Sequence, residues 1–227
     1  MLYLGLVFGV AAGNIAAHKA GMNALRVYVA TLILITVTLL GSRLFYVTTK
    51  WNIYRHNLRR ILDRHDGGLV MYGGLLAALL VSIPLTRTLH LNFGSFWDVS
   101  TFTILVGMIF TRVGCLLNGC CYGRASRSWL GVYLPDSRGI WEKRIPTQVM
   151  EAGCAVLLLI FASLTWRWMP FPSALFLCAT LGYSAARFIM EFARGREAGS
   201  PRFCVAHVIS VVAFVSSISA LTLYWRK

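Results

Sequence analysis

The sequence predicts an all-α membrane protein with about seven transmembrane helices, because it holds apolar stretches of spanning length. Of its 227 residues, 57% are hydrophobic and only 13% are charged, and the mean hydropathy is +0.66. Soluble domains usually carry about 25% charged residues. A helix needs ~20 apolar residues to cross the hydrocarbon core of a bilayer. The stretches of suitable length are 1–17, 27–49, 69–85, 96–117, 147–166, 171–192 and 203–225.

These stretches and their short connections use nearly the whole chain. We therefore expect a single transmembrane domain over residues 1–227, with a polar loop region around 118–146. The first stretch lacks the basic n-region of a signal peptide, because the chain begins Met1-Leu2-Tyr3-Leu4 and its first lysine is Lys19. We expect this stretch to remain as a helix.

The formal net charge of +14 raises the possibility of a nucleic-acid partner. The basic residues stand between the apolar stretches, however, and form no separate basic domain. Basic segments next to membrane spans are attracted to anionic lipid head groups. We therefore expect an anionic lipid surface as the partner and no nucleic acid.

Three arginines fall within apolar stretches: Arg43, Arg112 and Arg187. An arginine at the bilayer centre costs at least ~2.5 kcal/mol, so such residues normally face the bundle interior, pair with acids or line a cavity. Glu151 and Glu191 are placed similarly. Because Arg187 and Glu191 are one helical turn apart, a purely structural ion pair is the alternative for a single arginine. All three arginines together, near glycine-rich polar loops, predict a site.

The most informative segment is 111–124, TRVGCLLNGCCYGR, where an apolar stretch ends in an Asn-Gly turn flanked by arginines. Glycine adopts positive φ and lets the backbone approach a ligand closely. Exposed backbone N–H groups and arginine side chains suit a phosphate or another oxyanion. We expect Arg112 to contact such an anion. The loop around it is expected to be shaped by Asn118, Gly119 and Gly123.

Two further segments bring polar or flexible groups to the membrane boundary. Gly73 and Gly74 open the third apolar stretch, where they would allow close backbone approach, although glycine also serves helix packing in membranes. Pro146 suits the first turn of a helix. Gln148 and Glu151 then share one face of that helix, either joining helices or belonging to a site.

The six cysteines do not follow a disulfide pattern. Those in or beside apolar stretches, where we expect packing roles, are Cys154, Cys178 and Cys204. Cys115, Cys120 and Cys121 gather near the Asn-Gly turn, but they lack the Cys-x-x-Cys spacing of zinc or thioredoxin-type sites. We therefore expect no metal site and no cofactor. A nucleophilic Cys120, activated by nearby arginines, is the alternative role for this group.

Taken in order, these segments resemble the prolipoprotein diacylglyceryl transferase family. The matching residues are Arg26-Val27-Tyr28, the run GSRLFYV at 41–47, Gly73-Gly74-Leu75, Arg112-Val113-Gly114, Asn118-Gly119, Tyr122-Gly123-Arg124, Pro146-Thr147-Gln148, Glu151, Arg187-Phe188 and Glu191-Phe192. The resemblance implies a multi-pass enzyme of the bacterial plasma (inner) membrane. Such an enzyme transfers the diacylglyceryl group of phosphatidylglycerol to a cysteine thiol of a prolipoprotein, forming a thioether and releasing glycerol phosphate.

The resemblance also implies roles for individual residues. The partners it implies are an anionic phospholipid, phosphatidylglycerol, and a prolipoprotein or other thiol acceptor. Negative charge develops on the leaving phosphate, where arginines stabilise it. The expected catalytic residues are Arg112, Arg187, Tyr72 and Cys120. The expected substrate-binding residues are Arg43, Tyr28, Gly73, Gly74, Asn118, Gly119, Gly123, Gln148 and Glu151.

The chain departs from the family pattern at four positions. Tyr72 and Ile145 stand where the family has histidines, and Cys115 and Cys120 stand where it has Asn and Glu. Polar residues that the family uses for proton handling are therefore replaced. Two alternatives stay open: a non-catalytic protein that binds or transports anionic lipid, and a thiol-dependent membrane enzyme using Cys120.

Charge and resemblance favour opposite orientations in the membrane. The basic loop residues concentrate on the face that holds the loop around 118–146, and the positive-inside rule places that face in the cytoplasm. The resemblance implies that this face looks outward. Because several of its arginines are expected to bind ligand, we expect the outward orientation.

Overall fold

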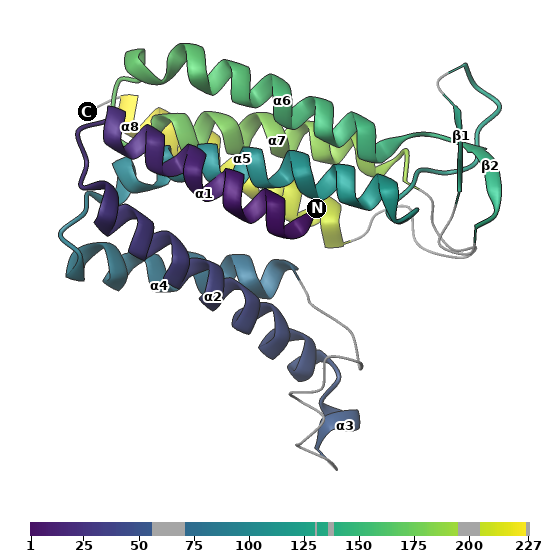
Figure 1. Ribbon diagram of the computed structural model, residues 1–227, viewed down its shortest axis with the longest axis horizontal. Coiled ribbons are helices and arrows are strands. Elements are labelled where there is room, and N and C mark those ends of the chain that lie inside the picture. The colour runs from purple at the N-terminus through teal and green to yellow at the C-terminus, as the bar shows by residue number, and fades with distance from the viewer. Residues whose placement is uncertain (56–70, 130, 136–138, 195–204, 226–227) are drawn as a thin grey trace. The chain divides into compact units, whose positions relative to one another are not determined.

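The computed structural model describes residues 1–55, 71–129, 131–135, 139–194 and 205–225. Within these ranges the long helices are α1 (Leu2–Lys19), α2 (Ala24–Thr49), α4 (Met71–Thr88), α5 (Phe93–Leu117), α6 (Thr147–Thr165), α7 (Ala174–Glu191) and α8 (Val205–Trp225) (Figure 1). The shorter elements are helix α3 (Trp51–Tyr54), the 3-10 helix η2 (Trp166–Trp168) and the strands β1 (Val132–Pro135) and β2 (Trp141–Arg144).

Five of the described helices are long and apolar enough to cross a membrane: α2, α5, α6 together with η2, α7 and α8. Helix α4 contributes a shorter apolar helix over Gly73–Thr88. Many large apolar side chains on these helices are exposed, such as Leu40 and Leu157, which suits a surface that lipid covers. The predicted all-α polytopic membrane protein is confirmed, whereas the total of about seven spans stays a prediction.

Helix ends differ from the predicted ones by a few residues, for local reasons. Helix α5 begins at Phe93 because Asn92 precedes it and accepts a hydrogen bond from the Ser95 N–H at 3.0 Å. Helix α7 begins at Ala174 because Ser173 has a left-handed backbone, with φ of 84°. Hydropathy locates a span but carries no information on such caps.

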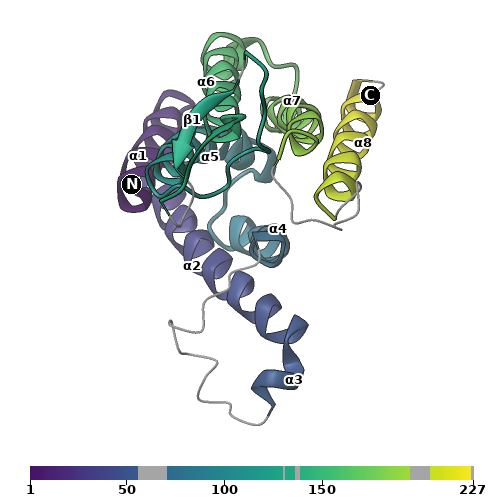
Figure 2. The same cartoon turned by 90° about the vertical axis from the view of Figure 1, so that its right-hand side faces the viewer.

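The described chain divides into two compact units, residues 17–96 and residues 1–16 with 97–227. The larger unit holds α6, α7, α8, the hairpin and most of α1 and α5. In it, α7 packs against both α6 and α8 (Figures 1 and 2). Asp98 on α5 accepts hydrogen bonds from the backbone N–H groups of Ser173 and Phe176, at 2.8 and 3.0 Å, and so fixes the start of α7. The single transmembrane domain stays a prediction.

Glycines four residues apart let α1 lie close to α5 within the larger unit. A Cβ atom at Gly5 would lie 3.0 Å from the Cβ of Phe110. A Cβ atom at Gly9 would lie 2.8 Å from the carbonyl oxygen of Thr103. This is the small-residue packing that membrane helices use where the hydrophobic effect does not drive their association.

The smaller unit packs α2 against α4. Gly73 and Gly74 lie at this interface, where a Cβ on Gly73 would overlap the side chain of Phe45 and a Cβ on Gly74 that of Ser42. Helix packing therefore accounts for both glycines. Their predicted contact with substrate stays a prediction.

The region around 118–146, expected to be a polar loop, contains a β-hairpin that the sequence did not predict. Strands β1 and β2 are antiparallel, with Val132 opposite Arg144. The segment before the hairpin is fixed by backbone hydrogen bonds from Gly123 to Ile145 and from Arg124 to Ala193, both at 2.9 Å. These bonds join the end of α5, the start of α6 and the end of α7 at one end of the unit.

Candidate active site

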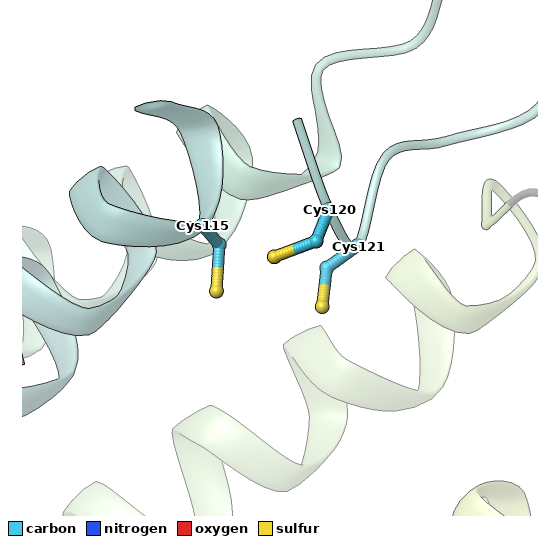
Figure 3. Close-up of side chains that lie close together, drawn as sticks. All are labelled: Cys115, Cys120 and Cys121. Carbon is cyan, nitrogen blue, oxygen red and sulfur yellow. The ribbon is translucent and has the colours of Figure 1, made fainter. Parts of the chain in front are cut away.

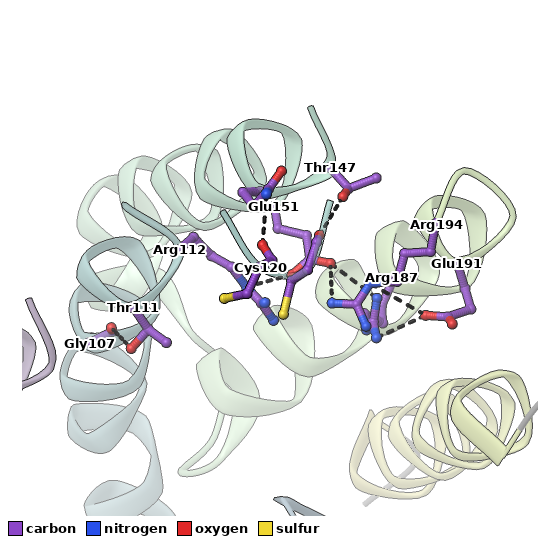
Figure 4. Close-up of polar contacts among 11 residues, drawn as sticks. Gly107, Thr111, Arg112, Cys120, Thr147, Glu151, Arg187, Glu191 and Arg194 are labelled. Atoms are coloured by element: carbon purple, nitrogen blue, oxygen red, sulfur yellow. Dashed lines mark hydrogen bonds and ion pairs between the residues drawn. The ribbon is translucent and has the colours of Figure 1, made fainter. Parts of the chain in front are cut away.

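A buried glutamate near the start of α6, Glu151, is surrounded by three arginines (Figure 4). Its side chain is only 1% exposed. The Nε of Arg112 lies 2.5 Å from one carboxylate oxygen. An Nη of Arg187 and an Nη of Arg194 lie 3.1 and 3.4 Å from the other. The carboxylate thus joins three helix ends through charge.

Glu191 supplies a second buried carboxylate. It lies 2.8 Å from Arg187 and 4.0 Å from Arg194, so the ion pair one helical turn along α7 is confirmed. We call Arg112, Glu151, Arg187, Glu191 and Arg194 the arginine cluster. With three guanidinium and two carboxylate groups, it has a formal excess of one positive charge. The side chains are mostly buried, so this charge is weakly screened.

The end of α5 places Arg112 and turns the chain toward the cluster. Gly119 has a left-handed backbone with φ of 58°, its N–H donates to the Leu116 carbonyl, and the Cys120 N–H donates to the Cys115 carbonyl. This is a Schellman motif, which stops a helix at a glycine. The predicted role of Gly119 in shaping the loop thus has a local cause, while Asn118 beside it is exposed.

Two side chains at the start of α6 hold the loop that follows. The Gln148 amide donates to the Cys120 carbonyl at 2.7 Å, and the Thr147 hydroxyl donates to the Cys121 carbonyl at 2.8 Å. The side-chain oxygen of Gln148 is buried and has no hydrogen-bond partner among the described residues. A buried acceptor without a partner is unusual. The contact of Gln148 with substrate stays a prediction.

Gly123 lies where three chain segments meet. A Cβ atom there would lie 2.5 Å from the Ile145 carbonyl oxygen and 2.8 Å from the Ala193 carbonyl oxygen. Close approach of the protein's own backbone therefore requires glycine. This packing helps to hold Arg194, which pairs with Gly123 in a β-bridge, in its place within the cluster.

Three thiols gather at the end of α5 (Figure 3). The sulfur atoms of Cys115, Cys120 and Cys121 all lie within 4.8 Å of one another. Burial, together with the neighbouring thiols, raises the pKa of Cys120 to about 12. The isolated thiol is therefore protonated at neutral pH, which argues against the alternative in which Cys120 is a nucleophile by itself.

The structure brings together five predicted residues: Arg112, Cys120, Gln148, Glu151 and Arg187.

Three other predicted residues belong to the smaller unit. The guanidinium of Arg43 lies 5.7 Å from the ring of Tyr46 and 5.8 Å from that of Tyr54, within the range of cation–π contact. Tyr28 is exposed on α2. The side chain of Tyr72 falls outside the part of the chain that the structure describes. Substrate contacts of all three stay predictions.

Three residues of the site were not predicted: Thr147, Tyr183 and Arg194. Tyr183 is close enough to Arg112 to interact with it electrostatically. Arg194 follows α7, and the sequence alone does not distinguish it from the other basic loop residues. Its spacing of three from Glu191 was the available signal, because that spacing places both on one side of a helix end.

Comparison with known proteins assigns the chain to a family. The family model described as prolipoprotein diacylglyceryl transferase matches residues 1–224. A protein of Listeria welshimeri named phosphatidylglycerol–prolipoprotein diacylglyceryl transferase is 29% identical over 201 residues, covering 85% of this chain and 72% of the relative. Proteins of the same name from Dehalococcoides mccartyi and Lactiplantibacillus plantarum are each 29% identical. They cover 88% and 98% of this chain, and 78% and 82% of their own length. The chain therefore belongs to the prolipoprotein diacylglyceryl transferase family.

Proposed function

We propose that this protein transfers the diacylglyceryl group of phosphatidylglycerol to a cysteine thiol of a prolipoprotein in the bacterial plasma membrane. The acceptor sulfur loses its proton and bonds to the glyceryl carbon. The bond between that carbon and the phosphate oxygen breaks, and glycerol phosphate leaves. Family membership supports the reaction, as do the names of the three relatives.

The observation that carries the proposal is the excess positive charge of the arginine cluster. Phosphatidylglycerol is anionic, and more negative charge develops on the phosphate oxygen as the carbon–oxygen bond breaks. Guanidinium groups bind phosphate oxygens through paired N–H donors. Fixed positive charge in a mostly buried site stabilises such a leaving group more than water does. Arg112 and Arg187 are the proposed phosphate ligands.

Glu151 and Glu191 organise these ligands. Three guanidinium groups repel one another when buried together, and the two carboxylates offset that repulsion. Each arginine has five N–H donors, so pairing with a carboxylate leaves donors free for a phosphate. The arginines are therefore held in place before the lipid arrives, which is the condition for effective electrostatic stabilisation.

The surroundings of the cluster suit the acyl chains of a lipid. Exposed apolar side chains stand on the three helix ends that carry the charges: Val113 and Leu117 on α5, Val149 and Met150 on α6, and Ile189 on α7. A phospholipid could lie along these apolar surfaces while its phosphate meets the arginines.

The test is complementation of a bacterial strain depleted of its own diacylglyceryl transferase. Expression of this chain is expected to restore growth and lipoprotein maturation, whereas Arg187→Ala at the same membrane level is expected to fail. Vesicles containing phosphatidylglycerol would measure lipid binding in parallel. A well-expressed chain that binds this lipid but never restores maturation would overturn the transferase and favour a non-catalytic lipid-binding protein.

A further inference from the structure

Three cysteines from two segments form a compact sulfur cluster at the end of α5. Cys115 lies in the last turn of the helix, and Cys120 and Cys121 follow the turn. Their sulfur atoms lie within 4.8 Å of one another, and Figure 3 shows the three side chains close together. In a tetrahedral zinc site with Zn–S bonds of about 2.3 Å, the sulfur atoms lie about 3.8 Å apart. Small side-chain rotations would bring the three sulfurs to this separation.

The backbone holds these cysteines in place. The Cys120 N–H donates to the Cys115 carbonyl at 3.0 Å, which ties the two positions together. Cys121 has φ of 59°, a left-handed conformation that residues other than glycine seldom adopt. The carbonyl groups of Cys120 and Cys121 are fixed by Gln148 and Thr147 on α6. The convergence of the thiols is thus built into the loop.

We propose that Cys115, Cys120 and Cys121 bind a zinc ion whose fourth position is open to the thiol of the acceptor substrate. Three sulfur ligands suit a borderline-soft ion such as zinc better than a hard cation. Within the residues that the structure describes, no further Cys, His, Asp or Glu side chain joins the group. Three protein ligands with an open fourth position are the arrangement of catalytic zinc.

The positive charge near the three cysteines and the exposure of one of them both favour a zinc site here. Three thiolates and one Zn²⁺ carry a net negative charge, and Arg112, one helical turn before Cys115, lies within electrostatic range of it. Cys121 is exposed, so the cluster has an open side for an incoming group. Cys115 and Cys120 are also two of the positions at which the chain departs from its family, where it lacks the Asn and Glu of the family pattern.

The site would supply the activated sulfur that the transfer needs, and this role rests on the proposed function. A thiol that coordinates zinc releases its proton to solvent and stays a thiolate at neutral pH. That sulfur then bonds to the glyceryl carbon while the carbon–oxygen bond to phosphate breaks toward the arginine cluster. The thioether product is uncharged and leaves the zinc, which does not change oxidation state.

The first experiment measures metal binding by the full-length protein in detergent. One Zn²⁺ or Cd²⁺ per chain is expected, with a thiolate-to-cadmium absorption band. Alkylation footprinting by mass spectrometry is expected to show metal-dependent protection of Cys115, Cys120 and Cys121, with Cys154 and Cys178 as unprotected controls. Because footprinting uses the unmodified chain, it does not depend on variants that fold. Failure of the metal to protect the three cysteines would overturn the proposal.

Serine variants then assign the ligands. Cys115→Ser, Cys120→Ser and Cys121→Ser are each expected to weaken metal binding by more than about tenfold, the lower end of what loss of an outer-shell partner costs. Cys154→Ser and Cys178→Ser are the matched controls and are expected to bind as the unmodified chain does. Equal affinity in all five variants would contradict the assignment.

The last experiment separates this proposal from the proposed function. A lipobox peptide with its cysteine is expected to raise the sulfur coordination of bound metal from three to four, as X-ray absorption reports, while a serine peptide is not. A fourth sulfur ligand without diacylglyceryl transfer would overturn the proposed transferase activity but would support the metal site. Transfer that is unchanged in chelated, metal-free protein would overturn the role of the metal while the transferase stands.

Discussion

Glu151 lets three guanidinium groups share one small buried volume. Its carboxylate contacts Arg112 through one oxygen and Arg187 and Arg194 through the other. An arginine in a membrane is expensive unless it is paired, so the carboxylate makes the site possible before any substrate binds. The excess charge that remains after pairing is what an anionic lipid would meet.

Replacing Glu151 is expected to destabilise the protein strongly. Glu151→Gln removes the shared carboxylate and leaves three arginines with Glu191 alone, and breaking a buried ion pair costs about 3–5 kcal/mol. Thermal unfolding in detergent would show this loss. The control is Glu142→Gln, because the Glu142 side chain is 48% exposed and pairs with Arg144. Surface pairs contribute about 0–1 kcal/mol, so equal small losses in both variants would contradict the role of Glu151.

Lysine is expected to be a poor substitute at Arg187. Arg187→Lys keeps the positive charge but loses the fork that contacts Glu151 and Glu191 at once. Removal of one donor to a developing anion typically lowers a rate by about 10²–10³, and we expect a fall of that size in diacylglyceryl transfer. Arg167→Lys, at an exposed position in η2, is the control. Equal rates for both variants would remove Arg187 from the site.

Among the elements, the connection from α5 to α6 has the most to do with function. It carries Cys120 and Cys121, the bridge from Gly123 to Arg194, and the hairpin of β1 and β2. Its path is set by the Schellman end of α5 and by the anchors Thr147 and Gln148. These anchors give the loop a fixed path, and a functional site needs such support from the residues around it.

Gly123 provides a test at this scale. Gly123→Ala would push a methyl group against the carbonyl oxygens of Ile145 and Ala193, so we expect displaced loop segments, lower thermal stability and loss of transfer activity. Gly153→Ala on α6 is the matched control, since a Cβ atom there meets nothing within 4 Å and alanine favours a helix by up to about 1 kcal/mol. Loss of activity in both variants, or in neither, would contradict this account of the loop.

Hydropathy predicted the helices well, because helix type in a membrane depends on apolar length. The start of α6 at Thr147 and the end of α5 at Leu117 were also predictable, from Pro146 and from the Asn-Gly turn. The hairpin was not, since strands of four residues are too short to show a period.

The site was only partly readable from the sequence. Arg112, Glu151 and Arg187 were chosen singly as polar groups in apolar stretches. That Arg112 pairs with Glu151 depends on the fold bringing the end of α5 to the start of α6, and it has no local signal. The cysteine spacing argued against a metal site, yet a left-handed turn at Gly119 and Cys121 brings the three sulfurs together.

At the scale of the whole molecule, the orientation of the protein in the membrane is still to be tested. We expect the face with the arginine cluster to look outward, despite its many basic residues. In spheroplasts treated with a metal chelator, a membrane-impermeant thiol reagent is expected to label the exposed Cys121, and Cys121→Ser to remove that labelling. Arg167→Cys, at the far end of α6, is expected to react only after permeabilisation. Labelling of Cys121 only in permeabilised cells would place the site in the cytoplasm instead.

The central claim is that the arginine cluster serves lipid transfer to a thiol. In the most direct measurement, the purified protein is incubated with labelled phosphatidylglycerol and a lipobox peptide. Mass spectrometry then gives the masses of the peptide, the protein and the released phosphate ester. The account predicts a peptide heavier by one diacylglyceryl group, an equal amount of glycerol phosphate, and an unmodified Cys120. A peptide of unchanged mass, or a label that stays on Cys120, would contradict it.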